Sequence, residues 1–343
     1  MKINILLPYK EKFDKNKASS VSITVRNNLL YSNYINHIKI FGQNVQNPFF
    51  EDNFVGLKYS ILSLKSKNKF LAHEMLKIIN KDIEKKQLIE IHNRPYLVQE
   101  ITKGNKFVVS LFFHNDPQTM KGSKSIKERE NILEKCAAIF CVSEFIKKKF
   151  LEGINVNLQK VHVLHNGVER KLKRIPKKKK EVLFVGRLVP EKGVHLYVDV
   201  IEKIANNYPD WNFDLIGSFR LGDDENKGSF VSEVITKFQN IGTQTHFHGF
   251  KNQNYVQQKM KSASIIVIPS IWEEPYGLVV SEAMSNGIAI IASDIGGIPE
   301  IIKENDILIK NISRLKLQDK LESLMSNSEK IKILQQLSWN NFG

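Results

Sequence analysis

The stretch Ser264-Ile-Ile-Val-Ile-Pro-Ser270, followed by Trp272-Glu-Glu-Pro-Tyr-Gly-Leu-Val-Val-Ser-Glu-Ala283, decides the fold. A short continuous apolar run such as the first is typical of a parallel strand buried on both faces. The Pro-x-Gly turn and the apolar residues behind it predict a helix over residues 277–286. Glu274 then lies on the strand-to-helix loop, and Glu282 lies about 7 Å along the helix axis. Free amides at a helix start suit a diphosphate, so this layout predicts a sugar-nucleotide site.

The same alternation of apolar runs and amphipathic stretches continues through most of the chain. It predicts right-handed crossovers and parallel, doubly wound sheets, an α/β fold. The expected strands are residues 3–7, 37–41, 87–92, 107–113, 138–142, 161–164, 181–185, 212–216, 245–249, 264–268 and 288–292. The expected helices are residues 19–32, 69–80, 124–136, 144–151, 194–207, 229–240, 252–260 and 277–286, with a helical tail over residues 312–343.

A basic segment interrupts this alternation. Residues 169–180 hold eight lysines and arginines, too much charge to pack in a core, so we expect an exposed linker. It separates a first domain of residues 1–168 from a second domain of residues 181–325. A C-terminal helix over residues 326–343 can pack back toward the first domain.

The charge balance limits the partners. With 51 Lys and Arg against 36 Asp and Glu, the net charge is +15, which suits nucleic acid, an anionic membrane surface or anionic small molecules. Aromatic-interleaved RNA-binding motifs are absent, so no nucleic acid partner is expected. Cys136 and Cys141 border or lie in an apolar run, which predicts buried structural thiols rather than a disulfide framework.

The lysine clusters have two explanations. Lys147, Lys148 and Lys149 adjoin Phe145, Ile146, Phe150 and Leu151, a pattern typical of an amphipathic helix on an anionic bilayer. Solvated surface charge explains the lysines equally well. No run reaches the about 20 apolar residues of a membrane span. We therefore expect a cytoplasmic protein that can rest on the inner face of the membrane.

A second loop carries cations. Val185-Gly-Arg-Leu-Val-Pro-Glu-Lys-Gly193 follows the first strand of the second domain and presents Arg187 and Lys192 where ligands of open α/β sheets bind. Two such cations would neutralise a leaving diphosphate. Alone they would be ordinary solvated side chains; together with Glu274 and Glu282 they predict a binding site.

These motifs, in their order, resemble the family 4 retaining glycosyltransferases (glycosyl transferases group 1) of bacterial lipopolysaccharide and polysaccharide synthesis. The resemblance rests on Gly186-Arg187, Glu191-Lys192-Gly193, Gly217-Ser218, Pro269-Ser270, Glu274-Pro-Tyr-Gly277, Glu282-Ala283, Gly296-Gly297 and Pro299-Glu300. It implies a GT-B architecture, two Rossmann-like domains facing each other across a cleft. It also implies a nucleotide-sugar donor, retention of configuration, no metal ion and no cofactor.

The resemblance also assigns roles to single residues. The residues that match Arg187 and Lys192 hold the donor phosphates in such enzymes, Glu274 matches the contact to the transferred sugar, and Glu282 matches the contact to the ribose. The whole implied donor site is Arg187, Lys192, Gly217, Glu274, Tyr276, Gly277, Leu278 and Glu282.

The first half matches the family less closely. His114 ends an expected strand, where family members often carry a histidine beside donor and acceptor; a histidine bonded to backbone at a strand end is the alternative. Ser143 is expected to cap a helix. The weaker acceptor candidates are Asn93, Arg94, Asn115 and Asp116. For Arg94 the alternative is a turn that only ends the strand before Pro95.

One departure concerns the loop after the first strand. The family usually has a glycine pair there, whereas residues 8–20 contain no glycine. Ser19 or Ser20 could cap the following helix and offer hydroxyls to phosphate instead. The lysines of this loop could also be plain solvent-facing charge.

The sequence therefore predicts a metal-independent, retaining hexosyltransferase. It would move a sugar from a UDP-sugar to a glycan or lipid-linked acceptor, with His114, Glu274, Arg187 and Lys192 as catalytic residues. In this interpretation Glu274 orients the donor sugar, while the leaving phosphate helps to deprotonate the acceptor. A non-catalytic or epimerase-like GT-B protein that binds sugar nucleotide or an anionic membrane surface is the alternative.

Overall fold

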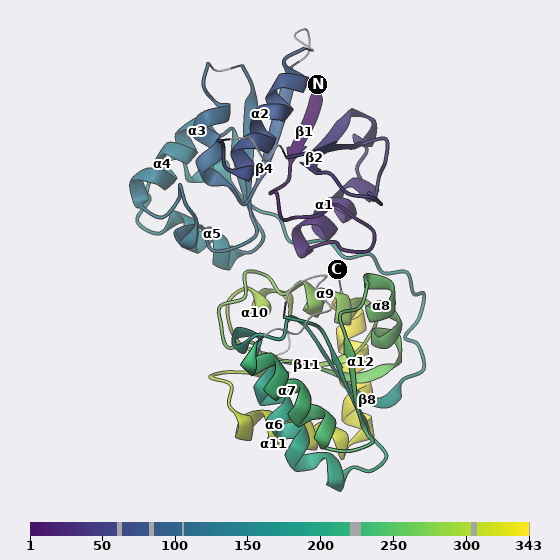
Figure 1. Cartoon of the computed structure of the whole chain (residues 1–343). Helices are drawn as coiled ribbons and strands as arrows, with labels where there is room; N and C mark the ends of the chain where they lie inside the picture. The colour runs from purple at the N-terminus through teal and green to yellow at the C-terminus, as the bar shows by residue number, and fades with distance from the viewer. Residues whose placement is uncertain (60–63, 82–85, 105, 220–227, 303–306, 343) are drawn as a thin grey trace. The chain divides into compact units, whose positions relative to one another are not determined.

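A computed structural model describes the chain except residues 60–63, 82–85, 105, 220–227, 303–306 and 343 (Figure 1). The described residues form two compact units, Met1–Gly167 and Val168–Gly343. Each unit is an α/β body around one parallel sheet, which confirms the predicted fold class.

The first unit has a seven-stranded parallel sheet in the order β3-β2-β1-β4-β5-β6-β7. Helix α1 lies on one face of the sheet, and α2 to α5 lie on the other (Figure 1). The strands are β1 (Lys2–Leu6), β2 (Ile38–Gln43), β3 (Phe54–Leu57), β4 (Gln87–His92), β5 (Val108–Phe113), β6 (Ala138–Cys141) and β7 (Val161–Val163). The helices are α1 (Ser20–Leu30), α2 (Lys67–Ile79), α3 (Val98–Ile101), α4 (Ile126–Lys135) and α5 (Glu144–Leu151).

The second unit has a six-stranded parallel sheet in the order β10-β9-β8-β11-β12-β13. Helices α6, α7 and α11 cover one face, and α8, α9 and α12 cover the other (Figure 1). The strands are β8 (Lys179–Val185), β9 (Asn212–Ile216), β10 (Thr245–Gly249), β11 (Ala263–Ile268), β12 (Ala289–Ser293) and β13 (Leu308–Ile309). The helices are α6 (Val194–Ile204), α7 (Ser229–Asn240), α8 (Gln253–Ser262), α9 (Leu278–Ser285), α10 (Ile298–Ile301), α11 (Arg314–Met325) and α12 (Ser328–Asn340).

The C-terminal tail is helical, as expected, and forms the two helices α11 and α12. The first helix ends at Met325 with Ser326 as its C-cap, and Asn327 caps the second, since its side chain accepts a hydrogen bond from Lys330 N. Helix α12 packs against α9, β11 and β12 of its own unit, and Gln335 Nε2 donates to Ser264 O over 3.1 Å. A sequence pattern cannot show this packing, because an amphipathic helix fits any apolar surface of the right size.

The basic segment before β8 is not a uniformly exposed linker. Lys179 and Lys180 already belong to β8. The Arg170 guanidinium lies 3.9 Å from the ring centroid of Trp339 and 4.5 Å from that of Phe342, and Nη2 donates to Trp339 O at 2.5 Å. Lys178 Nζ donates to the carbonyls of Met260 and Asn286. Long basic side chains therefore pin this segment to the unit, because their aliphatic stems pack while their cationic ends find acceptors.

The glycine-free loop after β1 is held by its own packing. Phe13 is fully buried and contacts the rings of Phe49 and Phe54, while Asp14 accepts from the backbone N–H groups of Asn16, Lys17 and Asn47. Ser19 caps α1, as predicted for one of the two serines, by accepting from Ser22 N. The lysines at 10, 12, 15 and 17 are exposed, as the solvent-facing interpretation expects.

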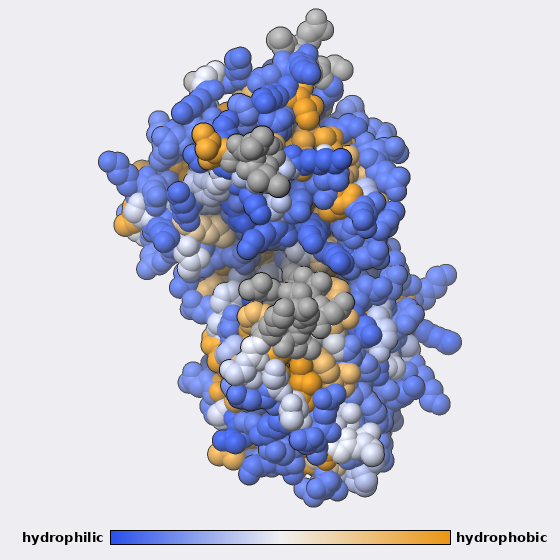
Figure 2. Space-filling view, viewed as in Figure 1, coloured by the Kyte–Doolittle hydropathy of each residue, from blue (hydrophilic) through white to orange (hydrophobic). Residues whose placement is uncertain are grey.

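Helix α5 does not present the apolar face that an interfacial helix requires. Ile146 and Phe150 are both fully buried in the first unit, so only the lysines and the half-buried Phe145 and Leu151 remain outside. Ser143 caps the helix as predicted, since its Oγ accepts from Ile146 N. The visible surface of the chain is mostly hydrophilic (Figure 2). Ile146 and Phe150 are therefore not available for the expected apolar contact with a bilayer.

Candidate functional site

The candidate site lies at the carboxyl edge of the second sheet, where β8 and β11 are neighbours. From β8 the chain continues outward to β9 and β10, and from β11 it continues the opposite way to β12 and β13. Such a reversal leaves a crevice outside the carboxyl ends of the two central strands, where open α/β sheets bind ligands. The loops that leave these two strands carry Lys192 and Glu274.

Lys192 and Glu274 form an ion pair across the two loops. Lys192 Nζ lies 2.5 Å from Glu274 Oε1, and Ser270 Oγ donates to the same oxygen over 2.6 Å. The Glu274 side chain is only 6% exposed, whereas the Lys192 side chain is 23% exposed. Lys192 Nζ also lies 5.6 Å from the ring centroid of Trp272, within the range of a cation–π contact. Two residues predicted from separate motifs thus meet at one point.

Two glycines let these loops approach each other backbone to backbone. Gly193 has φ +68°, and a Cβ there would lie 1.8 Å from Pro269 O. Gly296 has φ +61°, and a Cβ there would lie 2.2 Å from Glu274 O. Both positions therefore require glycine, for the conformation and for the space. They fix the loop that carries Glu274 from both sides.

Arg187 lies on the same loop as Lys192 and is half-buried. Backbone hydrogen bonds from Gly186 N to Ile216 O and from Leu188 N to Ser218 O hold this loop beside the end of β9, where Gly217 follows the strand. The Arg187 guanidinium has no hydrogen bond or ion pair with any residue that the structure describes. It is therefore a cation available to a ligand.

Helix α9 begins without a side-chain cap. Its N-cap residue is Gly277 at φ +93°, and Leu278 is its first residue. The first amides of a helix have no partner within the helix and carry its positive dipole end. Tyr276 just before them is buried, and Ser281 Oγ lies 3.2 Å from its hydroxyl; burial raises the pKa of this tyrosine.

Glu282 lies inside α9 and is 5% exposed. Gln253 Nε2, from the start of α8, donates to Glu282 Oε1 over 2.6 Å. Burial raises the pKa of Glu282 to about 7, and the hydrogen bond from Gln253 opposes this rise. Sequence reasoning missed Gln253; its position at the start of the helix after β10 was the available signal.

The candidate residues of the first unit cluster where β4 and β5 end. His114 is 8% exposed, and its backbone N–H donates to Asn93 Oδ1 over 2.8 Å. Its Nε2 lies 2.7 Å from Nδ1 of His92, whose Nε2 in turn lies 2.7 Å from Glu90 Oε1. Burial lowers the pKa of His114 well below its ordinary value, and the neighbouring His92 lowers it further. The sequence analysis missed Glu90 and gave His92 no role, although their i, i+2 spacing on a strand placed them on one face.

Three of the four acceptor candidates also serve the local structure. Asn93 adopts φ +51° and holds the backbone of His114, and Arg94 Nη1 donates to Asn93 O. Asp116 accepts from Gln118 N and so caps the short helical turn Pro117–Thr119. Asn115 is exposed. These contacts give Asn93 and Asp116 structural roles in their loops.

Within the described ranges, no group of three or more His, Cys, Asp or Glu side chains could hold a metal ion. His246 and His248 are engaged in hydrogen bonds: His246 Nε2 lies 3.2 Å from Asn212 Oδ1, and His248 contacts Asp214 and Tyr255. Of the helices in the described part of the chain, none is long and apolar enough to cross a membrane.

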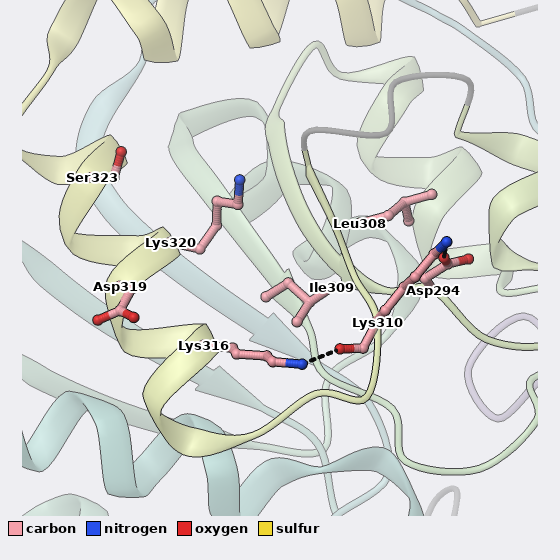
Figure 3. A pocket seen from close by; sticks show the side chains of 8 residues that line it. All are labelled: Asp294, Leu308, Ile309, Lys310, Lys316, Asp319, Lys320 and Ser323. Atoms are coloured by element: carbon pink, nitrogen blue, oxygen red, sulfur yellow. Dashed lines mark hydrogen bonds and ion pairs between the residues drawn. The ribbon is translucent and has the colours of Figure 1, made fainter.

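A pocket of about 650 Å³ lies in the second unit between β12, β13 and α11 (Figure 3). It is lined by Asp294, Leu308, Ile309, Lys310, Lys316, Asp319, Lys320 and Ser323. None of the predicted site residues belongs to it. Lys316 Nζ donates to Lys310 O. The other two lysines that line the pocket, Lys310 and Lys320, are surface side chains, so the pocket indicates no function.

Known proteins are similar to this chain in sequence. The chain is 27% identical over 264 residues to spore coat protein SA of Bacillus subtilis, covering 71% of this chain and 70% of that protein. It is 24% identical over 172 residues to lipopolysaccharide 1,2-N-acetylglucosaminetransferase of Salmonella typhimurium, covering 47% of this chain and 45% of that enzyme. The second of these relatives is thus matched over less than half its length.

Solved structures show the same architecture. Sucrose-phosphate synthase from Thermosynechococcus elongatus superposes with a TM-score of 0.78 at 17% identity, over 100% of this chain and 94% of that chain. Anabaena Alr3699/HepE, solved in complex with UDP-glucose, superposes with a TM-score of 0.72 at 15% identity, over 99% and 94%. The two Rossmann-like units therefore have the GT-B fold. The family model for glycosyl transferases group 1 matches residues 167–338, half of the chain, and the chain belongs to this family.

Proposed function

We propose that the protein is a retaining glycosyltransferase that transfers a sugar from a UDP-sugar to a glycan or lipid-linked acceptor. The observation that carries the proposal is the meeting of Lys192 with Glu274 at the reversal point of the second sheet. A cation beside a carboxylate, next to an uncapped helix start, suits a ligand that has a diphosphate joined to a polyhydroxylated sugar.

Each donor residue has a chemical task in this proposal. Lys192 and Arg187 neutralise the charge that grows on the diphosphate as it leaves, which is the largest electrostatic demand of such a step. The amides of Leu278 and its neighbour bind a phosphate oxygen. Glu274 accepts hydrogen bonds from the transferred sugar, and Glu282 accepts them from the ribose hydroxyls.

Uridine is proposed as the base because Alr3699/HepE, a GT-B protein of the same architecture, was solved with UDP-glucose. Family membership and the similarity to a lipopolysaccharide N-acetylglucosaminetransferase support an acceptor from bacterial envelope polysaccharide or lipopolysaccharide synthesis. The proposed reaction needs no metal, because Lys192 and Arg187 supply the positive charge that a divalent ion would otherwise supply to the diphosphate.

Retention follows in this proposal from attack on the same face that the diphosphate leaves. Glu274 is a poor nucleophile in its present surroundings, because Oε1 is already bound by Lys192 and Ser270. Mass spectrometry after incubation with donor alone tests this point: a sugar covalently attached to Glu274 would overturn the one-step interpretation. Proton NMR of the first product formed tests the anomeric configuration.

Any association with a membrane would be electrostatic. The net charge is +15, and the lysines at 147–149 remain on the surface after α5 has buried Ile146 and Phe150. We propose a contact with the anionic inner leaflet that weakens as salt rises, because such surface attraction is screened. Co-sedimentation with phosphatidylserine vesicles at low and high salt tests this; binding that resists salt would contradict it.

Nucleotide binding is the first experiment. UDP should raise the melting temperature in the presence of EDTA, and more than GDP or ADP does. Lys192→Ala and Glu274→Gln should weaken donor binding or turnover, whereas the exposed controls Lys203→Ala and Glu233→Gln should not. A UDP-sugar panel then identifies the donor by its slow hydrolysis. Absence of any shift with all three nucleotides, or interconversion of UDP-sugars without transfer, would contradict the proposed function.

A further inference from the structure

The first unit contains a row of aromatic side chains that crosses four adjacent strands. His92, Phe112, Phe140 and His162 are register partners on β4, β5, β6 and β7, so their side chains share one face of the sheet. The ring centroids of successive members are 5.0, 4.6 and 5.7 Å apart. This row fixes the ring plane of His92, which is 1% exposed.

Glu90, His92 and His114 form a hydrogen-bonded chain at one end of this row. The two links, Glu90 Oε1 to His92 Nε2 and His92 Nδ1 to His114 Nε2, are both 2.7 Å long. The His92 and His114 rings are inclined by only 17°, a geometry compatible with an in-plane hydrogen bond between the two imidazoles. His114 Nδ1 has no hydrogen-bond partner among the residues that the structure describes.

The hydrogen-bonded chain of Glu90, His92 and His114 determines which ring nitrogens carry protons. A carboxylate only accepts hydrogen bonds, so His92 must donate to Glu90 from Nε2. In a neutral His92, Nδ1 is then the acceptor, and it must receive the Nε2 proton of His114. His114 Nδ1 therefore carries the lone pair. A single proton added to the pair reverses the second link: His92 becomes the cation beside Glu90, and His114 Nδ1 becomes a donor.

We propose that Glu90 and His92 are positioning residues that hold His114 in the Nε2–H form, so that its Nδ1 accepts a hydrogen bond from a sugar hydroxyl of the bound substrates. The catalytic part of this inference rests on the proposed function. Burial, which lowers the pKa of His114, supports the neutral form that the geometry requires.

Among the described residues, the printed hydrogen bonds join His114 to one carboxylate, that of Glu90, through His92. His162 lies at the opposite end of the aromatic row and is exposed. Arg94 and Asp116 on the adjoining loops are engaged with Asn93 O and Gln118 N. Glu90 is thus the carboxylate that orients the chain. A row that served only for packing would tolerate any isosteric ring at position 92.

Four substitutions distinguish an effect on the tautomer of His114 from an effect on the packing of the aromatic row. His92→Phe keeps the aromatic row and removes the acceptor, whereas His92→Asn loses the ring and places a carbonyl oxygen near the position of Nδ1. Glu90→Gln keeps the shape and removes the charge. His162→Gln is the matched control at the other end of the row. Far-UV circular dichroism and thermal melting confirm that each variant of the full chain is folded.

Nitrogen-15 NMR of ring-labelled histidines reads the tautomer directly and needs no enzymatic activity. We expect His114 in the Nε2–H form in the wild-type protein, in His162→Gln and in His92→Asn, and a mixture or the Nδ1–H form in His92→Phe and Glu90→Gln. An Nδ1–H form in the wild-type protein at neutral pH would overturn the inference, even if the protein transferred no sugar at all.

Turnover of whichever UDP-sugar the donor panel selects tests the positioning role. We expect kcat to fall about tenfold or more in His92→Phe and Glu90→Gln, with KM for the donor little changed, and to recover in part in His92→Asn. In Glu90→Gln, the acid limb of the pH dependence of kcat should also shift. If His92→Phe and Glu90→Gln both keep the full kcat and an unchanged pH profile, the positioning role is rejected, whether or not the tautomer of His114 changes.

Discussion

Lys192 Nζ and Glu274 Oε1 lie 2.5 Å apart, although 82 positions separate the two residues in the chain. Each compensates the charge of the other in a setting where the carboxylate is almost fully buried. In the proposed function, a bound nucleotide sugar replaces this pair by two others, lysine with phosphate and glutamate with sugar hydroxyls. The ligand-free protein thus keeps both groups in place without leaving a buried charge unpaired.

The first prediction concerns this pair. Lys192→Ala leaves the Glu274 carboxylate with Ser270 as its remaining described partner, and should lower the free energy of unfolding by about 1–3 kcal/mol. Adding Glu274→Gln should restore part of that loss, because the uncompensated charge disappears. Urea unfolding of both single variants and the double variant measures the coupling. Strictly additive losses would show that the pair contributes nothing.

The second prediction concerns the pH dependence of stability at Glu282. Burial raises its pKa in the folded protein from 4.5 to about 7, so the folded state binds more protons than the unfolded state between these values. The contribution of Glu282 to stability therefore falls as pH rises from about 4.5 to about 7. Glu282→Gln should be more stable than the wild-type protein at pH 8, by on the order of 3 kcal/mol at most, and the gap should shrink at pH 5.

Urea unfolding at pH 5 and pH 8 checks this second prediction, with Glu233→Gln as an exposed control whose effect should not change with pH. The same Glu282→Gln variant should bind UDP more weakly, since ribose would lose its carboxylate partner. A variant that is less stable than the wild-type protein at pH 8 would show that ionised Glu282 stabilises the fold.

The third prediction concerns the segment that enters β8. Arg170 is placed between Trp339 and Phe342 and donates to a helix-end carbonyl, so Arg170→Ala should cost about 1–3 kcal/mol of unfolding free energy. Arg170→Lys should recover only part, because an ammonium cannot stack flat on an indole. Arg174→Ala, an exposed change four residues later, is the control. Equal effects at both positions would contradict the packing.

The fourth prediction concerns thiol reactivity. Burial raises the pKa of both Cys136 and Cys141 to about 12, so neither forms the thiolate that reacts at ordinary pH. Ellman's reagent at pH 8 should therefore label no thiol in the folded protein and two in urea. Rapid labelling of the native protein would indicate local opening of β6 or of the end of α4.

Much of the architecture could be predicted from local patterns. The predicted bounds agree with the observed ones for the strands β4, β9 and β10 and for the helices α5 and α7. Apolar residues recur with a regular period in such elements, because one face of each packs against the core. Strands β3 and β13 were not predicted. Each has at most four residues, and its pairing depends on a neighbouring strand instead of on its own composition.

The candidate site was predictable in its donor half and only partly in its other half. Lys192 and Glu274 stand in specific motifs, so their chemistry was visible from sequence. Gln253 and Glu90 have no such context, since each is an ordinary polar residue until its neighbour in space is known. The apolar side of α5 illustrates the same limit: a helix face that suits a membrane suits a protein core equally well.

By itself the sequence determined the α/β class, the two sheets and the loops that carry the charged residues, because hydrophobic period and turn chemistry act over a few residues. The tertiary structure alone decided which side chains meet. It paired Lys192 with Glu274, set Gln253 against Glu282, anchored Arg170 on α12, and joined Glu90, His92 and His114 into one chain. These contacts depend on strand order and loop packing, which bring together residues that no local pattern relates.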